Sequence, residues 1–351
     1  RLSRFRDRIR IFGKQVEESF PDIAYQGLEP VGRWFRGRNR GLAEAFWRHV
    51  RANPPALTEV HNRPQVFHHL AKRFKTLPLT LHFHNDPQPM KACRTPAERR
   101  ATLDRAAAIY CVSHYVRGRF LDGVDGDAAK VHVLYNGIER PWSVPPEKEK
   151  IILFVGRLIP DKGAMEFVEA VAPVLVRHPG WRAVMAGAKK PGRAGRFTGY
   201  EKAVYDRITR IGPAAEFLGY RPYDAVMELF GRAAIAVVPS LWAEPFGRTA
   251  AEALACGCSL VSSDRGGLAE IGAGRGLLVA DPSSPSLGEA IERLVSDDAL
   301  RADLQERAWR DFPFDIRALT ARQDDLRAGL LTRQSASAAG RWPRIRRTVN
   351  R

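Results

Sequence analysis

The feature that most constrains the fold is a repeated alternation of short apolar runs and helical segments along most of the chain. Nine runs are rich in valine, isoleucine and leucine and do not alternate with polar residues, which is typical of strands buried on both faces of a parallel sheet. These runs are residues 78–83, 107–112, 130–135, 150–155, 181–187, 215–220, 234–240, 259–264 and 276–281. Segments with helical periodicity lie between them at residues 113–121, 163–177, 198–211, 222–232 and 247–256. The repeated β-α-β order predicts an α/β protein with doubly wound parallel sheets.

The length and one linker-like segment predict two domains. The chain has 351 residues, and residues 143–150 (SVPPEKEK) combine two prolines with a run of charges, as domain linkers do. We therefore expect an N-terminal domain at residues 1–147 and a C-terminal domain at residues 148–311. A further helix is expected at residues 312–333, packed back on the N-terminal domain, and a flexible basic tail at residues 334–351.

The net charge of +17 is partly local. Arginines crowd residues 1–10 and 33–40, and residues 341–351 (RWPRIRRTVNR) carry five arginines and no acid. Such clusters attract polyanions, either nucleic acid or an anionic membrane surface, although a solvated tail would have the same composition. No apolar run reaches the roughly 18 residues of a membrane span. The sequence starts at Arg1 without a methionine, so a lost N-terminus could carry a signal peptide.

Four cysteines are spaced without a Cys-x-x-Cys pair: Cys93, Cys111, Cys256 and Cys258. We expect them to be small buried apolar side chains in a reduced compartment.

The segment EPFGRTAAEALACG (residues 244–257) carries the strongest functional signal. It places Glu244 in the loop after a buried strand and Glu252 on the second turn of the helix that follows. Ligands of open α/β sheets bind at the carboxyl end of the strands, and a helix N-terminus suits phosphate. A carboxylate at that point must have another task, and accepting hydrogen bonds from sugar hydroxyls is one that it can perform.

This segment resembles the signature of the retaining glycosyltransferases of family 4, which have the GT-B fold of two Rossmann-like domains facing a cleft. Further pieces resemble family segments in the same order within about residues 55–330: EVHNRP (59–64), LHFHNDP (81–87), CVSHYVR (111–117), VLYNGIE (133–139), FVGRLIPDKG (154–163) and FLGY (217–220). Each piece alone is weak, but the ordered set is specific.

The resemblance implies a role for each matching residue. It implies that Glu252 binds the ribose hydroxyls of a nucleotide and Glu244 binds hydroxyls of the transferred sugar. Arg157 and Lys162 flank a strand-to-helix turn and would meet the diphosphate. Other donor contacts are implied for the backbone N–H groups and turns at Phe246, Gly247, Arg248, Gly156 and Gly219. His84, at the end of a strand in the N-terminal domain, is implied to face the cleft and contact the donor sugar or the acceptor.

Other residues have competing interpretations. His61 and Asp86 are weaker candidates for the same site, His82 is expected to be structural, and Glu270 is either a site residue or part of a turn. Asp125 and Asp127 form an Asp-x-Asp pair, but they lie in a glycine-rich loop before a strand, where a turn explains them better than a metal site does. No GxGxxG follows a first strand, and Glu244 and Glu252 share one helix end, so neither a dehydrogenase nor a glycoside hydrolase is expected.

The sequence therefore predicts a metal-independent retaining hexosyltransferase with no cofactor beyond its nucleotide diphosphate sugar donor. The expected acceptor is a glycan or glycolipid of the bacterial envelope, and nucleic acid is not an expected partner. The expected location is the cytoplasm, with a peripheral position on the inner face of the cytoplasmic membrane as an option. The glycine-rich loop with which family members begin is missing before residue 100, so truncation or true absence are both open. The alternatives are a nucleotide-sugar epimerase of similar fold and a non-catalytic polyanion binder. Nothing in the sequence specifies the nucleotide, sugar, acceptor, linkage or oligomeric state.

Overall fold

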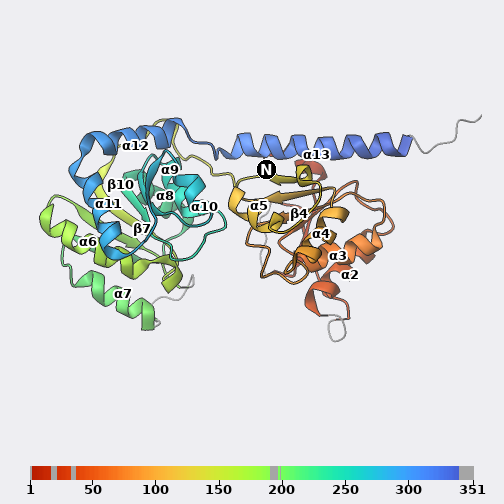
Figure 1. Cartoon of the computed structure of the whole chain (residues 1–351), viewed down its shortest axis with the longest axis horizontal. Coiled ribbons are helices and arrows are strands. Elements are labelled where there is room, and N and C mark those ends of the chain that lie inside the picture. Colours follow the sequence, from red (N-terminus) through yellow and green to blue (C-terminus); the bar gives the residue numbers. More distant parts are fainter. Residues whose placement is uncertain (1, 17–21, 33–36, 190–196, 198, 340–351) are drawn as a thin grey trace, which may run out of the picture. The chain divides into compact units, whose positions relative to one another are not determined.

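The computed structural model describes residues 2–16, 22–32, 37–189, 197 and 199–339, with residues 334–339 described by their backbone alone. It contains two compact units (Figure 1). The first consists of Arg1–Val112, Val116–Leu134 and Arg317–Arg351, and the second of Ser113–Tyr115 and Tyr135–Ile316.

The second unit begins ahead of the boundary that we predicted at residue 147. The segment before the proline-rich stretch belongs to it because its side chains pack there. Trp142 lies so close to the backbone of Gly231 that a Cβ at that glycine would be 2.6 Å from the indole ring. Ile138 also forms a parallel bridge with Asp315 near the end of the unit.

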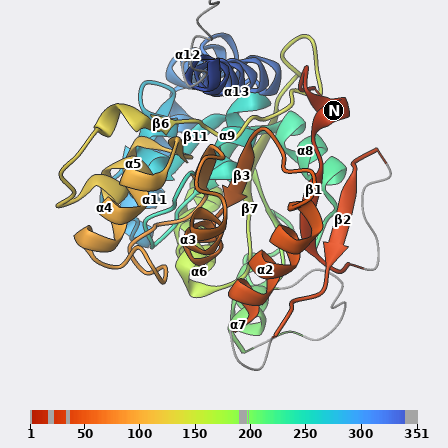
Figure 2. The same cartoon turned by 90° about the vertical axis from the view of Figure 1, so that its right-hand side faces the viewer.

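The first unit contains two separate parallel sheets. Its elements are η1 (Arg6–Arg8), β1 (Ile11–Lys14), β2 (Tyr25–Leu28), α2 (Arg38–Val50), β3 (Thr58–His61), α3 (Pro64–Arg73), β4 (Leu79–Phe83), α4 (Pro96–Arg105), β5 (Ala108–Cys111), α5 (His114–Leu121), η2 (Ala128–Lys130), β6 (Val131–Val133) and α13 (Ile316–Ala339). The short strands β1 and β2 pair with each other, side by side in Figure 2. The main sheet has the order β3-β4-β5-β6, so each strand lies beside its neighbour in sequence.

Helix α13 belongs to the first unit by its packing. Leu326 and Leu330 contact the cluster that Tyr110 and Leu134 form with Ala108. Arg327 makes two hydrogen bonds, of 3.1 and 2.6 Å, to the carboxylate of Glu59 on β3. The helix continues to Ala339, past the position where we predicted a flexible spacer, because serine and alanine are compatible with a helix already under way. The basic residues 341–351 lie outside the described residues.

The second unit contains one six-stranded parallel sheet and the helices that cover it. Its elements are β7 (Glu149–Val155), η3 (Pro160–Lys162), α6 (Ala164–Arg177), β8 (Arg182–Ala186), α7 (Gly199–Thr209), β9 (Ala215–Gly219), α8 (Tyr223–Arg232), β10 (Ala233–Val238), α9 (Arg248–Ala255), β11 (Ser259–Ser263), α10 (Gly267–Gly272), β12 (Gly276–Val279), α11 (Ser284–Ser296) and α12 (Asp298–Arg310). The strand order is β12-β11-β10-β7-β8-β9, the doubly wound order of Rossmann folds.

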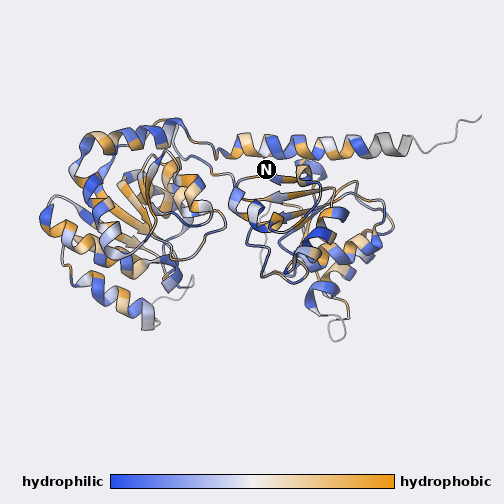
Figure 3. Ribbon diagram, viewed as in Figure 1, coloured by the Kyte–Doolittle hydropathy of each residue, from blue (hydrophilic) through white to orange (hydrophobic). Residues whose placement is uncertain are grey.

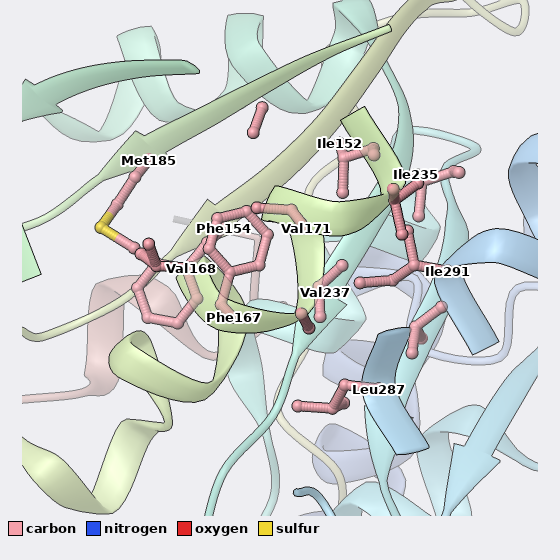
Figure 4. Packing of buried hydrophobic residues seen from close by; sticks show 14 of the residues in the cluster. Ile152, Phe154, Phe167, Val168, Val171, Met185, Ile235, Val237, Leu287 and Ile291 are labelled. Carbon is pink, nitrogen blue, oxygen red and sulfur yellow. The ribbon is translucent and has the colours of Figure 1, made fainter. Parts of the chain in front are cut away.

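Both faces of this sheet are buried, which explains why its strands read as unbroken apolar runs. Alternate residues of β7 divide between two clusters: Ile152 and Phe154 pack with Phe167 of α6 and Leu287 of α11, as Figure 4 shows. Ile151 and Leu153 pack on the other face with residues of α8 and α9. The strands are accordingly orange in Figure 3, while the covering helices carry both colours.

The predicted fold class is confirmed, and all nine predicted runs contain strands. The four cysteines are free and buried, as expected. Burial raises the pKa of the Cys93 thiol to about 12, so these residues act as apolar side chains.

Candidate functional site

The site lies in the second unit, where the strand order reverses. β7 and β10 are neighbours at the centre of the sheet. β7 leads to α6, in the cluster on one face, and β10 leads to α9, in the cluster on the other. The loops after the two strands therefore diverge and leave a crevice at their carboxyl ends. A cavity of about 120 Å³ lies there, lined by Phe154, Val155, Gly156, Lys162, Val238, Pro239, Ser240, Glu244, Gly247, Arg248 and Thr249.

A glycine turn brings Lys162 to this crevice. Gly163 has a φ of +68°, and a Cβ on it would overlap the carbonyl oxygen of Pro239. The backbone N–H of Leu241 donates to the carbonyl of Asp161 at 2.9 Å, which joins the two loops directly. Only glycine permits both the left-handed backbone and the close approach of this turn to the Pro239 carbonyl. Gly163 therefore determines the position of Lys162.

Glu244 is a buried carboxylate with two donors. Its side chain pairs with Lys162 and accepts a hydrogen bond of 2.8 Å from the hydroxyl of Ser240. The Lys162 ammonium also lies 5.5 Å from the centre of the Trp242 ring. The Glu244 carbonyl accepts from the N–H of Gly267 at 2.7 Å, which holds the loop in place. Ser240 was not among the predicted site residues, although its position four residues before Glu244 at a strand end was a usable signal.

Glu252 is the second buried carboxylate, 6% exposed, on a helix whose other inward residues are mostly alanines. Arg248, one helical turn earlier, donates to it at 2.7 Å. Burial raises the pKa of Glu252, and the hydrogen bond from Arg248 only partly opposes that shift. Arg248 lines the cavity and is hydrogen-bonded to Glu252, which is not itself a lining residue.

The start of α9 offers free backbone donors. Within the part of the chain that the structure describes, the N–H groups of Phe246, Gly247 and Arg248 have no hydrogen-bond acceptor. Gly247 has a φ of +97°, and a Cβ there would overlap the side chain of Leu268. Unpaired N–H groups at a helix N-terminus attract anions.

The remaining residues predicted to contact the donor differ in whether they lie at the cavity. Gly156 lines the cavity, and its N–H donates to Ala186 at 3.1 Å. Arg157 follows it, is exposed, and has no ion-pair partner among the described residues. Gly219 ends β9, the edge strand, and does not line the cavity.

His84 lies in the first unit, immediately after β4. Its Nε2 is 3.0 Å from Nδ1 of His61, and its backbone N–H donates to the Asn62 side chain at 3.2 Å. The weaker candidate Asp86 is held by Arg119 at 3.0 Å and by the backbone N–H of Gln88. Glu270, in the second unit, accepts from the N–H groups of His114 and Tyr115 and from the Tyr135 hydroxyl. The carboxylates of Asp86 and Glu270 therefore have structural partners.

Glu59, His61 and His82 have the right atoms for a metal ion, all within 4.8 Å of one another. The rings of His61 and His82 are stacked 4.3 Å apart at 20°, however, so their in-plane lone pairs do not converge on one point. Both oxygens of Glu59 are also bonded to Arg327. Coordination would require His61 to rotate and the guanidinium to leave.

Among the described residues, every helix is too short or too polar to cross a bilayer.

Two parallel-sheet units, one in Rossmann order with paired acids and cations at its switch point, define a protein of the GT-B class. Family comparisons agree: residues 138–311 match the model described as glycosyl transferases group 1, and residues 3–140 match that of Glycosyltransferase Family 4. The chain belongs to the glycosyltransferases that these two models describe.

Individual relatives support the same assignment. The chain is 25% identical over 71% of its length to the lipopolysaccharide 1,2-N-acetylglucosaminetransferase of Salmonella typhimurium, and 36% identical over 46% to a D-inositol 3-phosphate glycosyltransferase of Corynebacterium jeikeium. It spans 66% and 39% of these two relatives.

Solved structures resemble it in fold. Anabaena HepE in complex with UDP-glucose superposes with a TM-score of 0.67 at 20% identity, over 88% of this chain and 86% of that one. Sucrose-phosphate synthase from Thermosynechococcus elongatus gives 0.69 at 21% identity, over 94% and 89%.

Proposed function

We propose that this glycosyltransferase moves a hexose-like sugar, with retention and without an obligate metal, from a nucleotide diphosphate sugar to a hydroxyl of a bacterial envelope glycan. The observation that carries the proposal is the pairing of two buried carboxylates with two cations around the switch point of the second sheet, Lys162 with Glu244 and Arg248 with Glu252. Burying a carboxylate costs free energy that pairing with a cation only partly offsets, and a packed helix such as α9 does not need one.

The diphosphate, the sugar and the ribose of the donor can each be matched to groups of this site. A diphosphate carries negative charge that grows as the sugar–phosphate bond breaks. Arg157, Lys162 and the free N–H groups at the start of α9 would stabilise that charge, which is the work that a metal ion does in other transferases. Glu244 would then exchange its bond with Lys162 for hydroxyls of the sugar, and Glu252 would accept hydrogen bonds from the ribose. Anabaena HepE, whose structure contains UDP-glucose, supports a nucleotide sugar as the donor.

The acceptor is the less constrained half of the proposal. The lipopolysaccharide transferase among the relatives and the basic sequence ends favour an envelope glycan assembled on lipid at the inner face of the cytoplasmic membrane. His84 would face the donor sugar or the acceptor, as the family resemblance implies.

The test is a thermal-shift panel of nucleotide diphosphate sugars, followed by turnover of each hit with envelope glycans as acceptors. Binding to the folded state raises the melting temperature by mass action, about 2.7 kcal/mol of stabilisation at 100 times Kd. Transfer to a glycan with the anomeric configuration kept supports the proposal. Epimerisation of the donor sugar without an acceptor indicates an epimerase, and absence of both binding and turnover indicates a polyanion binder.

A further inference from the structure

A row of aromatic rings crosses the main sheet of the first unit. His61 on β3 pairs in register with His82 on β4, His82 with Tyr110 on β5, and Tyr110 with His132 on β6. Residues paired in this way point to the same face of a parallel sheet. Ring centres are separated by 4.3, 4.6 and 5.6 Å along the row. His61 is the end of this row, and its ring is supported on one side by His82.

His84 adds to the row beyond the end of β4. It lies two residues after His82, and its ring is nearly parallel to that of His61, with centres 5.3 Å apart at 12°. Nε2 of His84 and Nδ1 of His61 are 3.0 Å apart, so one donates and the other accepts. Asn62 holds the backbone on both sides: its N–H donates to the His82 carbonyl at 2.7 Å, and its side chain accepts from the His84 N–H. Ring and backbone of His84 are thus each tied to β3.

An ion pair lies beside the row. Glu59 lies 3.6 Å from Nε2 of His82 and is itself held by Arg327 of α13. Arg327 also pairs with Asp324 at 2.9 Å, and Asp324 accepts from the hydroxyl of Ser3 and the N–H of Arg4. The Glu59–Arg327 pair therefore lies beside His82 on the β3 side, while the Tyr110 ring packs against His82 from β5.

We propose that His61 is a positioning residue, which holds the ring of His84 in one orientation and one tautomer and leaves Nδ1 of His84 as the nitrogen presented to a substrate. The inference rests on the proposed function, in which His84 contacts the donor sugar or the acceptor. Desolvation together with His82 lowers the pKa of His61 to about 3, and desolvation lowers that of His84. Both rings are then neutral near pH 7, and in a neutral pair the hydrogen bond decides which nitrogen of each ring carries the proton.

Three variants separate the hydrogen bond from the stacking. His61→Phe keeps a ring on His82 but cannot bond to His84. His61→Asn loses the ring but keeps a polar amide near the position of Nδ1. His132→Phe, at the other end of the same row, is the matched control, because His132 does not contact His84.

The first readout is the tautomer of His84, measured by ¹⁵N chemical shifts of its two ring nitrogens in the full chain and assigned with His84→Gln. The parent and His132→Phe should show a single tautomer, and His61→Phe a mixture of both. His61→Asn should restore one tautomer. An unchanged His84 tautomer in His61→Phe would overturn the proposal, whatever happens to the rate.

The second readout is transfer. Loss of one hydrogen bond that only orients a side chain should lower kcat about tenfold in His61→Phe with little change in donor KM. His61→Asn should recover much of that loss, and His132→Phe should match the parent. A fall in kcat as large in His132→Phe as in His61→Phe would mean a general structural effect and would reject the positioning role. If the parent transfers no sugar to any acceptor, the proposed function fails, while the tautomer measurement still decides whether His61 controls the ring of His84.

Discussion

Glu252 is a single residue whose position costs stability. Its carboxylate is buried in an apolar helix, burial raises its pKa, and Arg248 is its one hydrogen-bond donor among the described residues. Residues placed in this way in a binding site are commonly kept at a cost in stability.

We therefore expect Glu252→Gln to weaken nucleotide binding without unfolding the protein. The amide removes a charge-assisted acceptor, worth roughly 1.5–3 kcal/mol, so the affinity for UDP or another bound nucleotide should fall at least about tenfold in calorimetry. The melting temperature should stay level or rise, because a neutral amide costs less to bury. Glu228→Gln, on the exposed side of α8, is the control. Unchanged affinity in Glu252→Gln would remove this residue from the site.

Arg157 and Lys162 should respond differently to truncation, although both are assigned to the diphosphate. Arg157→Ala removes an exposed side chain, so stability should not change, while the transfer rate should fall about 10²-fold if it stabilises developing charge. Lys162→Ala should lower both the rate and the melting temperature, because it leaves the buried Glu244 without its cation. Rates and melting curves of both variants test this, and a parental rate in the double variant would exclude a diphosphate site.

Glu59 gives a prediction with a defined pH dependence. Burial tends to raise its pKa, but the nearby His82 ring and the hydrogen bonds from Arg327 outweigh burial and lower it from 4.5 to about 2. As pH falls, the unfolded chain takes up the proton first, so the stability contributed by the ionised carboxylate is full above about pH 4.5 and declines toward pH 2.

Glu59→Gln should thus destabilise the protein by about 3 kcal/mol at pH 7. This value is at the lower end of the range for a broken buried ion pair, because Arg327 still pairs with Asp324 in the variant. The difference from the parent should narrow as pH is lowered from 4.5 toward 2. Urea unfolding of both proteins at several pH values measures it. A difference that stays constant over this range would show that Glu59 does not titrate as inferred.

At the scale of elements, a few glycines determine where the loops of the site stand. Gly163→Ala forces a left-handed alanine and an overlap with the Pro239 carbonyl, so we expect a loss of at least about 2 kcal/mol. Gly329→Ala is the opposite case: it lies exposed inside α13 with open space around it, and the change should stabilise by about 1 kcal/mol. Thermal unfolding of the two variants checks both signs, and equal effects would contradict this account.

The elements that the sequence predicted best are those whose environment is uniform. Strands β7 and β10 are apolar on both faces because helices cover both, and that pattern is visible without a structure. Strand β3 was not predicted as a strand because its four residues include Glu59 and His61, whose partners come from α13 and β4. β1 and β2 were missed for a related reason, since each contains a glycine and has one strand neighbour.

The site, too, has features that local sequence patterns predicted and features that they did not. Glu244, Glu252 and Lys162 were predictable because strand, loop and helix signals place them at one edge of a sheet. The pairings Lys162 with Glu244 and His61 with His84 were not, because they join residues 82 and 23 positions apart. Such contacts depend on strand order and register, which local patterns do not specify.

At the scale of the whole molecule, the large positive charge has two components. Many arginines of the described residues are already paired: Glu44 alone is bonded by Arg48 and Arg73. The five arginines of residues 341–351, which lie outside the described residues, are accompanied by no acid in that segment. A segment of this kind is suited to an anionic surface.

Deleting residues 341–351 should therefore weaken binding to anionic vesicles and leave nucleotide binding unchanged. Each arginine near such a surface contributes about 1 kcal/mol within roughly a Debye length, so binding of the parent should also fall with salt. Co-sedimentation of both forms with anionic and neutral vesicles at two salt concentrations measures this. Equal binding by the two forms would leave the segment as a solvated extension.

The adjacency of Gly137 and Ile316 bears on how this protein could have been assembled. A Cβ on Gly137 would lie 2.8 Å from Cα of Ile316, and the N–H of Ile316 donates to the Ile138 carbonyl at 3.2 Å. The chain therefore enters and leaves the second unit at adjacent points. Adjacent ends are required if a domain is to be inserted into another domain without disturbing the fold of either one. A segment joined in this way meets the condition for exchange as one piece, because Gly137 leaves room for the returning backbone.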